Sequence, residues 1–349
     1  MAEHTPELLN RFGAAIAQSA HALATRLSPR DISVASGRSL TWDLANALQA
    51  RRHLGAVVRI KDRRLAELYL DRFERCQAER AKLPMQVVHG DLNDYNVLVN
   101  RKLMGGEGRG VGMYGTRGAD SKGTRGAGSE AGGGFSFRKW LGNRFRPDAG
   151  SVSVTAAGLT ILDFGDIVYS ARVYDLAIAL AYVCQNKSDG QTALSTACAV
   201  VRGYSAYANA HTSAQPSRAL GRKELRLLHA CVCVRLAQSV LISAHAIGED
   251  PSNSEYIAIN SASGWALMRQ WSDLSPSDAE SAYVTAAAEG AGQSPPFLPA
   301  HILAVLRWAQ PDEPPIRRNL LFTGALVGAA AVLVLAVGVA AVRTIARHI

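Results

Sequence analysis

Two short polar motifs hold the residues of this chain that are best suited to chemistry. The first reads His89-Gly90-Asp91-Leu92-Asn93-Asp94-Tyr95-Asn96, and the second reads Asp163-Phe164-Gly165-Asp166. An aspartate five residues before an asparagine, followed later by an aspartate ahead of Phe-Gly, is the set that phosphoryl transfer requires. One carboxylate accepts the proton of the attacking hydroxyl, and an amide and a second carboxylate hold Mg²⁺, which prefers oxygen donors. We therefore predict Asp91 as the catalytic base and Asn96 and Asp163 as the metal ligands.

Short apolar runs flank both motifs and must position them. Residues 86–88 form a β-type run before the first motif, and residues 97–99 return to strand after it. A second apolar strand, residues 159–162, delivers Asp163 to the same edge. The alternative interpretation is two unrelated polar turns. It does not explain why both motifs occur together, in this order and at strand ends.

With their flanking residues, both motifs resemble the sequences of a known family, the aminoglycoside phosphotransferase and choline kinase superfamily. Residues 88–99 and 163–170 are similar to the 5-hydroxylysine kinase branch, which includes kinase domains fused to class III aminotransferases. The resemblance runs from about residue 40 to about residue 273, with one interruption. Further matching positions are Trp42-Asp43-Leu44, the run from Asp175 to Tyr182, Pro251, Asn253, Tyr256, Ala262 and Gly264-Trp265.

The resemblance implies an α+β fold: the large, C-terminal lobe of a protein-kinase-like enzyme, mostly helical with a catalytic β-hairpin. It also implies transfer of the γ-phosphoryl group of GTP or ATP to the hydroxyl of a small amino alcohol, with 5-hydroxylysine the leading candidate. The branch is expected to favour GTP.

Several further residues are candidates for supporting roles. His89 is expected to hold the catalytic loop by hydrogen bonding, and the resemblance implies that Asp175 supports the same loop. Asp166 is either a metal or substrate contact or the N-cap of a helix over residues 167–183. The remaining candidates for contact with the substrate are Asn93, Asp94, Tyr95 and Arg235. For Arg235, as for Ser239 and His245, the alternative is an amphipathic core helix over about residues 224–247.

The residues before the first motif predict helices over 7–27, 43–54 and 62–83. They contain neither a Gly-rich strand pair nor a strand lysine of the kind that binds nucleotide phosphates, because Lys61 and Lys82 lie in or beside helical patterns. The lobe is thus assigned to residues 1–100 and 159–275. Two alternatives remain open: a catalytically inactive membrane-anchored pseudokinase or binding protein, and a truncated gene model that lacks the nucleotide-binding lobe.

The positive charge is concentrated in one segment. The net charge is +9, and residues 101–150 hold ten Lys and Arg against four Asp and Glu, with 15 of the 31 glycines. Such a composition cannot bury enough apolar surface to offset its ordering entropy, so we predict a disordered insertion over residues 101–158. Nucleic acid is an unlikely partner because few aromatic residues accompany the arginines.

The C-terminal part predicts a membrane anchor. After a linker over residues 276–318, residues 319–343 are assigned to a transmembrane helix, because residues 320–342 are 23 consecutive uncharged residues. As a helix they would span roughly 34 Å, enough for a hydrocarbon core of about 30 Å. We expect a single-pass tail anchor with the kinase-like region on the cytosolic face of a membrane.

The cysteines agree with a reducing compartment. There are five, at positions 76, 184, 198, 231 and 233, with no metal-type spacing. Cys231 and Cys233 point about 200° apart on a helix, so they cannot chelate together. We expect free structural thiols.

Overall fold

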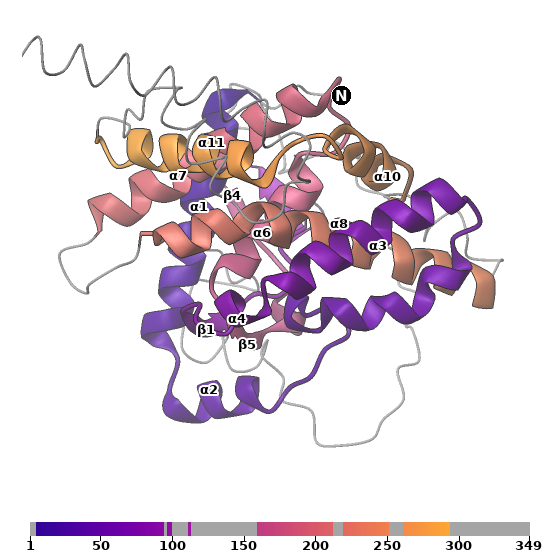
Figure 1. The fold of residues 1–349 in the computed structure, drawn as a ribbon. Coiled ribbons are helices and arrows are strands. Elements are labelled where there is room, and N and C mark those ends of the chain that lie inside the picture. The colour runs from indigo at the N-terminus through magenta and orange to yellow at the C-terminus, as the bar shows by residue number, and fades with distance from the viewer. Residues whose placement is uncertain are drawn as a thin grey trace, which may run out of the picture. The chain divides into compact units, whose positions relative to one another are not determined.

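The computed structural model describes residues 5–93, 96–99, 159–211, 219–250 and 261–293, and the backbone of residues 111–112. As predicted, the fold is α+β and mostly helical, with two small antiparallel sheets (Figure 1). All the described residues belong to one compact unit, within residues 1–295.

The N-terminal part is helical because caps and apolar spacing agree. Helix α1 (Pro6–Arg26) begins at Thr5, whose side chain accepts a hydrogen bond from the Leu8 amide. Helix α2 (Pro29–Ser36) begins with a capping box between Ser28 and Asp31. The next elements are a 3₁₀ helix, η1 (Leu44–Ala56), and helices α3 (Ile60–Arg75) and α4 (Gln77–Arg80). The helix predicted over 62–83 is therefore two helices.

Two small sheets carry the two motifs. Strand β1 (Met85–Val88) pairs with β5 (Val168–Ala171), with Met85 opposite Ala171. In the second sheet, β2 (Val97–Val99) lies between β3 (Val111–Gly112) and β4 (Leu159–Ile161). The strands predicted to form a β-hairpin are found as the antiparallel β2–β4 pair, so Asn96 and Asp163 flank strands that lie side by side.

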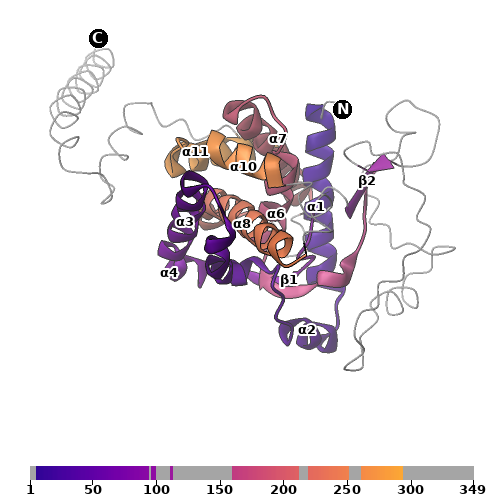
Figure 2. The same ribbon diagram turned by 90° about the vertical axis from the view of Figure 1, so that its right-hand side faces the viewer.

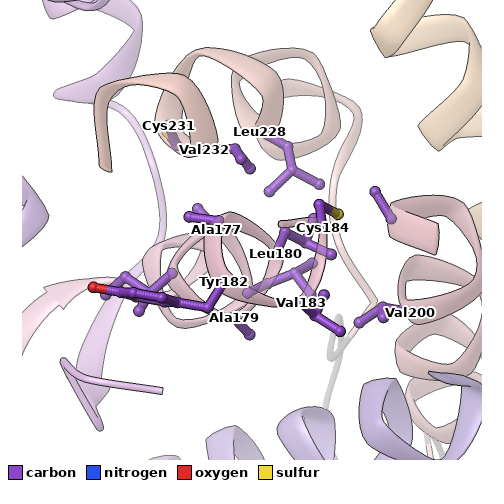
Figure 3. Packing of buried hydrophobic residues seen from close by; sticks show 14 of the residues in the cluster. Ala177, Ala179, Leu180, Tyr182, Val183, Cys184, Val200, Leu228, Cys231 and Val232 are labelled. Atoms are coloured by element: carbon purple, nitrogen blue, oxygen red, sulfur yellow. The ribbon is translucent and has the colours of Figure 1, made fainter. Parts of the chain in front are cut away.

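The core forms around α6 (Val173–Val183), in which every residue is buried. It packs against α8 (Arg222–Glu249) and α7 (Gly190–Ala210), and α8 has α3 on its other side (Figures 1 and 2). Figure 3 shows Leu180 and Val183 of α6 close to Leu228 of α8 and Val200 of α7. Helix α10 (Ser261–Gln270) also packs on α8. All five cysteines are free, as predicted.

Three boundaries differ from the sequence predictions. Residues 276–290, assigned to a linker, form α11 (Pro276–Gly290), which packs on α7 and α8 through a row of small residues and Tyr283. The helix expected over 167–183 begins only at Val173, because residues 168–171 pair with β1. Val111 and Gly112, in the segment predicted to be disordered, pair with β2. The rest of that insertion lies outside the described residues.

The predicted membrane helix, residues 319–343, also lies outside the described residues. Within the described part of the chain, α8 is the one helix long and apolar enough to cross a membrane. However, 72% of the most apolar 18-residue stretch of α8 is buried inside the protein. We therefore interpret α8 as a core helix, and it is weak evidence for a transmembrane helix.

Candidate active site

The Asp91 carboxylate is the centre of a hydrogen-bond network in the first motif. Its Oδ1 lies 3.0 Å from Arg235 Nη2, and its Oδ2 accepts a 2.8 Å bond from Asn93 Nδ2. The Asn96 amide donates to the Asp91 backbone oxygen at 2.9 Å and to Oδ2 at 3.2 Å. The Asp91 side chain remains 25% exposed, so a substrate hydroxyl can still approach it.

Asp175 of α6 holds the start of this loop through two backbone amides. It is fully buried and accepts hydrogen bonds from the amides of His89 at 2.8 Å and Gly90 at 2.9 Å. Burial raises the pKa of this carboxyl group, and the nearby His89 and the two amide bonds oppose that increase. Asp175 therefore contacts the catalytic loop directly, and its supporting role stays a prediction.

His89 joins the two motifs. Its Nε2 lies 2.8 Å from the Leu162 carbonyl, immediately before Asp163, and its Nδ1 accepts from the Asp91 amide at 3.3 Å. These partners assign the ring proton to Nε2. The ring also lies 4.7 Å from the Phe164 ring, centroid to centroid. These contacts place His89 between the two motifs, and its role in holding the loop stays a prediction.

The second motif lies against the first, backbone to backbone. Asp163 has a left-handed backbone (φ 56°), and its Oδ1 accepts a 3.2 Å bond from the Gly165 amide. The Leu162 amide donates to the Asn96 carbonyl at 2.8 Å. Gly90 has φ +82°, and a Cβ built there would lie 2.3 Å from the Asp166 carbonyl oxygen. Only glycine allows the two loops to approach this closely.

Arg38 supports the Asp163 loop from the segment after α2. Its Nη1 donates to the Ile167 carbonyl at 2.6 Å, and its Nη2 donates to the Gly165 carbonyl at 2.7 Å. Between these carbonyls lies Asp166, at the end of the short 3₁₀ helix η4 (Phe164–Asp166). Burial raises the pKa of Asp166, the negative charges of Asp91 and Asp163 raise it further, and Arg38 opposes them. Asp166 precedes a strand, so it is not the helix cap that was considered.

Arg235 lies behind Asp91 and is 1% exposed. Besides Asp91, its guanidinium donates to the Trp42 carbonyl at 2.6 Å and to Gln238 Oε1 at 3.3 Å. The ring centroids of Trp42 and Tyr182 lie 5.2 and 5.7 Å from its central carbon. Arg235 therefore contacts the predicted base, and its burial separates it from a substrate in this arrangement.

The residues present suit a divalent cation. Because the Asn96 amide nitrogen is turned toward Asp91, its Oδ1 remains for a metal, and Asp163 supplies a carboxylate nearby. The charges of Asp91 and Asp163 both raise the pKa of Asp166, so the site has a negative potential that a cation would relieve. Among the described residues no three or more His, Cys, Asp or Glu side chains form a metal-binding group. The predicted ligands Asn96 and Asp163 are an amide and one carboxylate, so they would not form such a group of three.

The structure brings together Asp91, Asn93, Asn96, His89, Asp175 and Arg235, and it places Asp163 and Asp166 on the adjoining loop. Asp94 and Tyr95 lie outside the described residues. His245 stacks on His53 with ring centroids 4.1 Å apart, and it has no described contact with Asp91. Sequence reasoning missed Arg38 and Gln238. The match at Trp42-Asp43-Leu44 did mark the segment whose carbonyls Arg235 and Gln238 bind.

Comparison with known proteins gives a consistent set of relatives. The chain is 24% identical over 267 residues to a hydroxylysine kinase of Mus musculus, covering 76% of this chain and 55% of that protein. It is 22% identical to the hydroxylysine kinases of Bos taurus and Xenopus laevis, over 77% of this chain and 56% and 57% of theirs. No family model and no solved structure matches the chain.

The chain thus spans about half the length of the curated relatives it matches. The matches confirm the resemblance of this chain to the hydroxylysine kinase branch.

Proposed function

We propose that this chain is the large lobe of a phosphotransferase that moves the γ-phosphoryl group of GTP or ATP to the hydroxyl of a small amino alcohol, with 5-hydroxylysine the leading acceptor. The observation that carries the proposal is the convergence of Asp91, Asn96 and Asp163 on two loops tied together by His89. The relatives named hydroxylysine kinase support the choice of acceptor.

In this proposal each residue has one task. Asp91 orients the acceptor hydroxyl and takes its proton as the phosphoryl group transfers. Asn96 Oδ1 and the Asp163 carboxylate hold Mg²⁺, which would neutralise charge on the nucleotide phosphates. His89, Asp175 and Arg38 fix the two loops before substrate arrives, so that little reorganisation is needed during the reaction.

Two variants separate these tasks. Asp163→Asn should abolish Mg²⁺-dependent nucleotide binding, because a neutral amide does not replace the carboxylate. Asp91→Asn should leave nucleotide binding nearly intact and greatly reduce turnover, because proton acceptance is needed only during transfer. Asp71→Asn, which changes a surface partner of Arg51, is the control and should alter neither quantity. Calorimetric titration of GTP and ATP with Mg²⁺, and phosphate transfer to 5-hydroxylysine, measure both. Equal loss of binding in the Asp91 and Asp163 variants would contradict the assigned roles.

One observation favours a second candidate, a non-catalytic pseudokinase that binds a metabolite or partner. The Asp91 carboxylate already accepts hydrogen bonds from Arg235, Asn93 and Asn96, which leaves one of its roughly four acceptor positions for a substrate hydroxyl. Wild-type protein that binds an amino alcohol but shows no Mg²⁺-dependent nucleotide binding and no transfer would establish this alternative.

We further propose that residues 320–342 span a membrane as a helix. The support is compositional: 23 uncharged residues can satisfy their backbone hydrogen bonds internally in lipid. Wild-type protein should then resist extraction by high salt and alkaline carbonate and be released by detergent. Val334→Arg with Leu335→Arg should release it, because two central arginines cost about 5–7 kcal/mol on the insertion scale. Retention of the double variant in the carbonate pellet would show that this segment is not the anchor.

A further inference from the structure

The residues just before α3 and in its first turns expose apolar and basic side chains together. Val58 is 89% exposed and Ile60 is 63% exposed, the highest values among the large hydrophobic residues that the structure describes as exposed. Four cations accompany them within seven positions. We call this set the basic–apolar patch, and its members are Val58, Arg59, Ile60, Lys61, Arg63 and Arg64.

Pairing with carboxylates does not explain the cations. In the described part of the chain none of the four forms an ion pair with a carboxylate; Arg63 donates instead to the Val57 carbonyl at 2.9 Å. The nearby acid, Asp62, is buried and paired with Arg269 from α10. Arg59, Lys61, Arg63 and Arg64 also lie at the start of α3, where the helix dipole disfavours positive charge.

Helix geometry places the apolar and basic groups on a shared surface. Ile60 and Arg64 are four positions apart on α3, and Lys61 and Arg64 are three apart, so their side chains are neighbours. Val58 precedes the helix next to Arg59. A single exposed aliphatic side chain is ordinary, but two in one cationic segment match a surface that is both negative and apolar.

We propose that the basic–apolar patch contacts the surface of an anionic lipid bilayer. Lipid headgroups supply the negative charge that the four cations lack within the described protein, and the acyl boundary accepts the Val58 and Ile60 side chains. Charge complementarity favours an anionic bilayer over a neutral one, and the aliphatic pair favours a bilayer over a polyanion that is polar throughout. The contact does not depend on catalysis or on residues 320–342.

The test uses the full chain carrying Val334→Arg and Leu335→Arg, so that the C-terminal segment does not hold the protein in lipid. Sedimentation with vesicles of phosphatidylcholine alone, and with about one third phosphatidylserine, measures the binding. Two patch variants are compared: Val58→Ser with Ile60→Ser, and Arg59→Gln with Lys61→Gln and Arg64→Gln. The control, Arg30→Gln with Arg75→Gln and Lys223→Gln, removes the same charge from exposed positions elsewhere. Thermal unfolding confirms that all variants fold.

We expect binding to the anionic vesicles alone, lost at high salt, and weakened about tenfold or more in the patch charge variant because each cation contributes separately. The serine variant should also weaken binding, while the control should not. If the control weakened vesicle binding equally, binding would depend on net charge and not on the patch, and the proposal would be overturned. Wild-type affinity in the serine variant would overturn it too, since the aliphatic pair would have no role. No vesicle binding at all would also overturn the proposal.

Discussion

Gly90 offers the sharpest test of how the two motifs are coupled, because the catalytic loop and the Asp163 loop touch there through backbone atoms. In Gly90→Ala, the new Cβ would lie 2.3 Å from the Asp166 carbonyl oxygen, and real Cβ atoms essentially never come nearer than 3.0 Å. The two loops must therefore separate by at least about 0.7 Å, the difference between these distances. Arg38, which binds the carbonyls on either side of Asp166, opposes that movement.

The expected loss of stability has two parts. The backbone at Gly90 is left-handed (φ +82°), which costs an L-residue about 1–2 kcal/mol. Overpacking against the Asp166 carbonyl adds about 1–3 kcal/mol, so the free energy of unfolding should fall by about 2–5 kcal/mol in all. The same separation moves Asp163 away from Asn96, so Mg²⁺-dependent nucleotide binding should weaken by about a hundredfold or more.

Gly292→Ala is a matched control. Its φ is +68°, so the backbone cost is similar, yet nothing lies within 4 Å of a Cβ at this position. Urea unfolding of both variants isolates the steric part, and calorimetric titration of nucleotide with Mg²⁺ measures the effect on the site. If Gly90→Ala loses no more stability than Gly292→Ala and binds nucleotide like the wild type, the two loops are not coupled through this contact.

Two further predictions concern Arg38 and the buried His229. Arg38→Met should raise the Mg²⁺ concentration needed for half-maximal nucleotide binding about tenfold, because it frees the Asp163 loop. The control, Arg30→Met, should not change this concentration. Equal effects of the two variants would exclude a positioning role for Arg38. His229 is buried with its pKa lowered by burial to about 4, so only the unfolded chain takes up a proton between pH 6.5 and 4. Stability should thus fall by about 2–3 kcal/mol from about pH 7.5 to about pH 4.5, and His229→Leu should remove that part of the slope in urea unfolding. An unchanged slope in His229→Leu would refute the assignment.

The parts of the site that sequence predicted best are those encoded within a few residues. The two motifs, their flanking strands and the β2–β4 pair depend on local apolar alternation and on turn residues, which are visible in one segment at a time. The helix around Arg235 was equally visible. The role of Arg235 could not be predicted from this pattern, because the spacing on α8 fits both an acceptor pocket and a core helix. Only the packing of α8 behind Asp91 decides between them.

The residues that were missed act across long sequence separations. Arg38 binds carbonyls 127 and 129 positions away, and a backbone carbonyl has no sequence signature. A glycine is needed at position 90 because the Asp166 carbonyl lies too close for a Cβ, and no local sequence pattern predicts that contact. Helix α11 was taken for linker because its buried face uses small residues, whose packing depends on the close approach of α7. There the carbonyl of Arg202 lies 2.1 Å from where a Cβ of Gly290 would stand.

The surroundings of Asp91 bear on how it would act in transfer. A carboxylate that accepts bonds from a buried guanidinium and two amides is held in one orientation. In a loose phosphoryl-transfer transition state the acceptor hydroxyl needs little early deprotonation, so orientation matters more than basicity. Arg235 suits this task better than a lysine would, because its planar fork binds Asp91 and the Trp42 carbonyl at once, and two aromatic rings lie near its central carbon. The same pairing that favours the pseudokinase alternative is thus compatible with an Asp91 that positions the acceptor hydroxyl and receives its proton late.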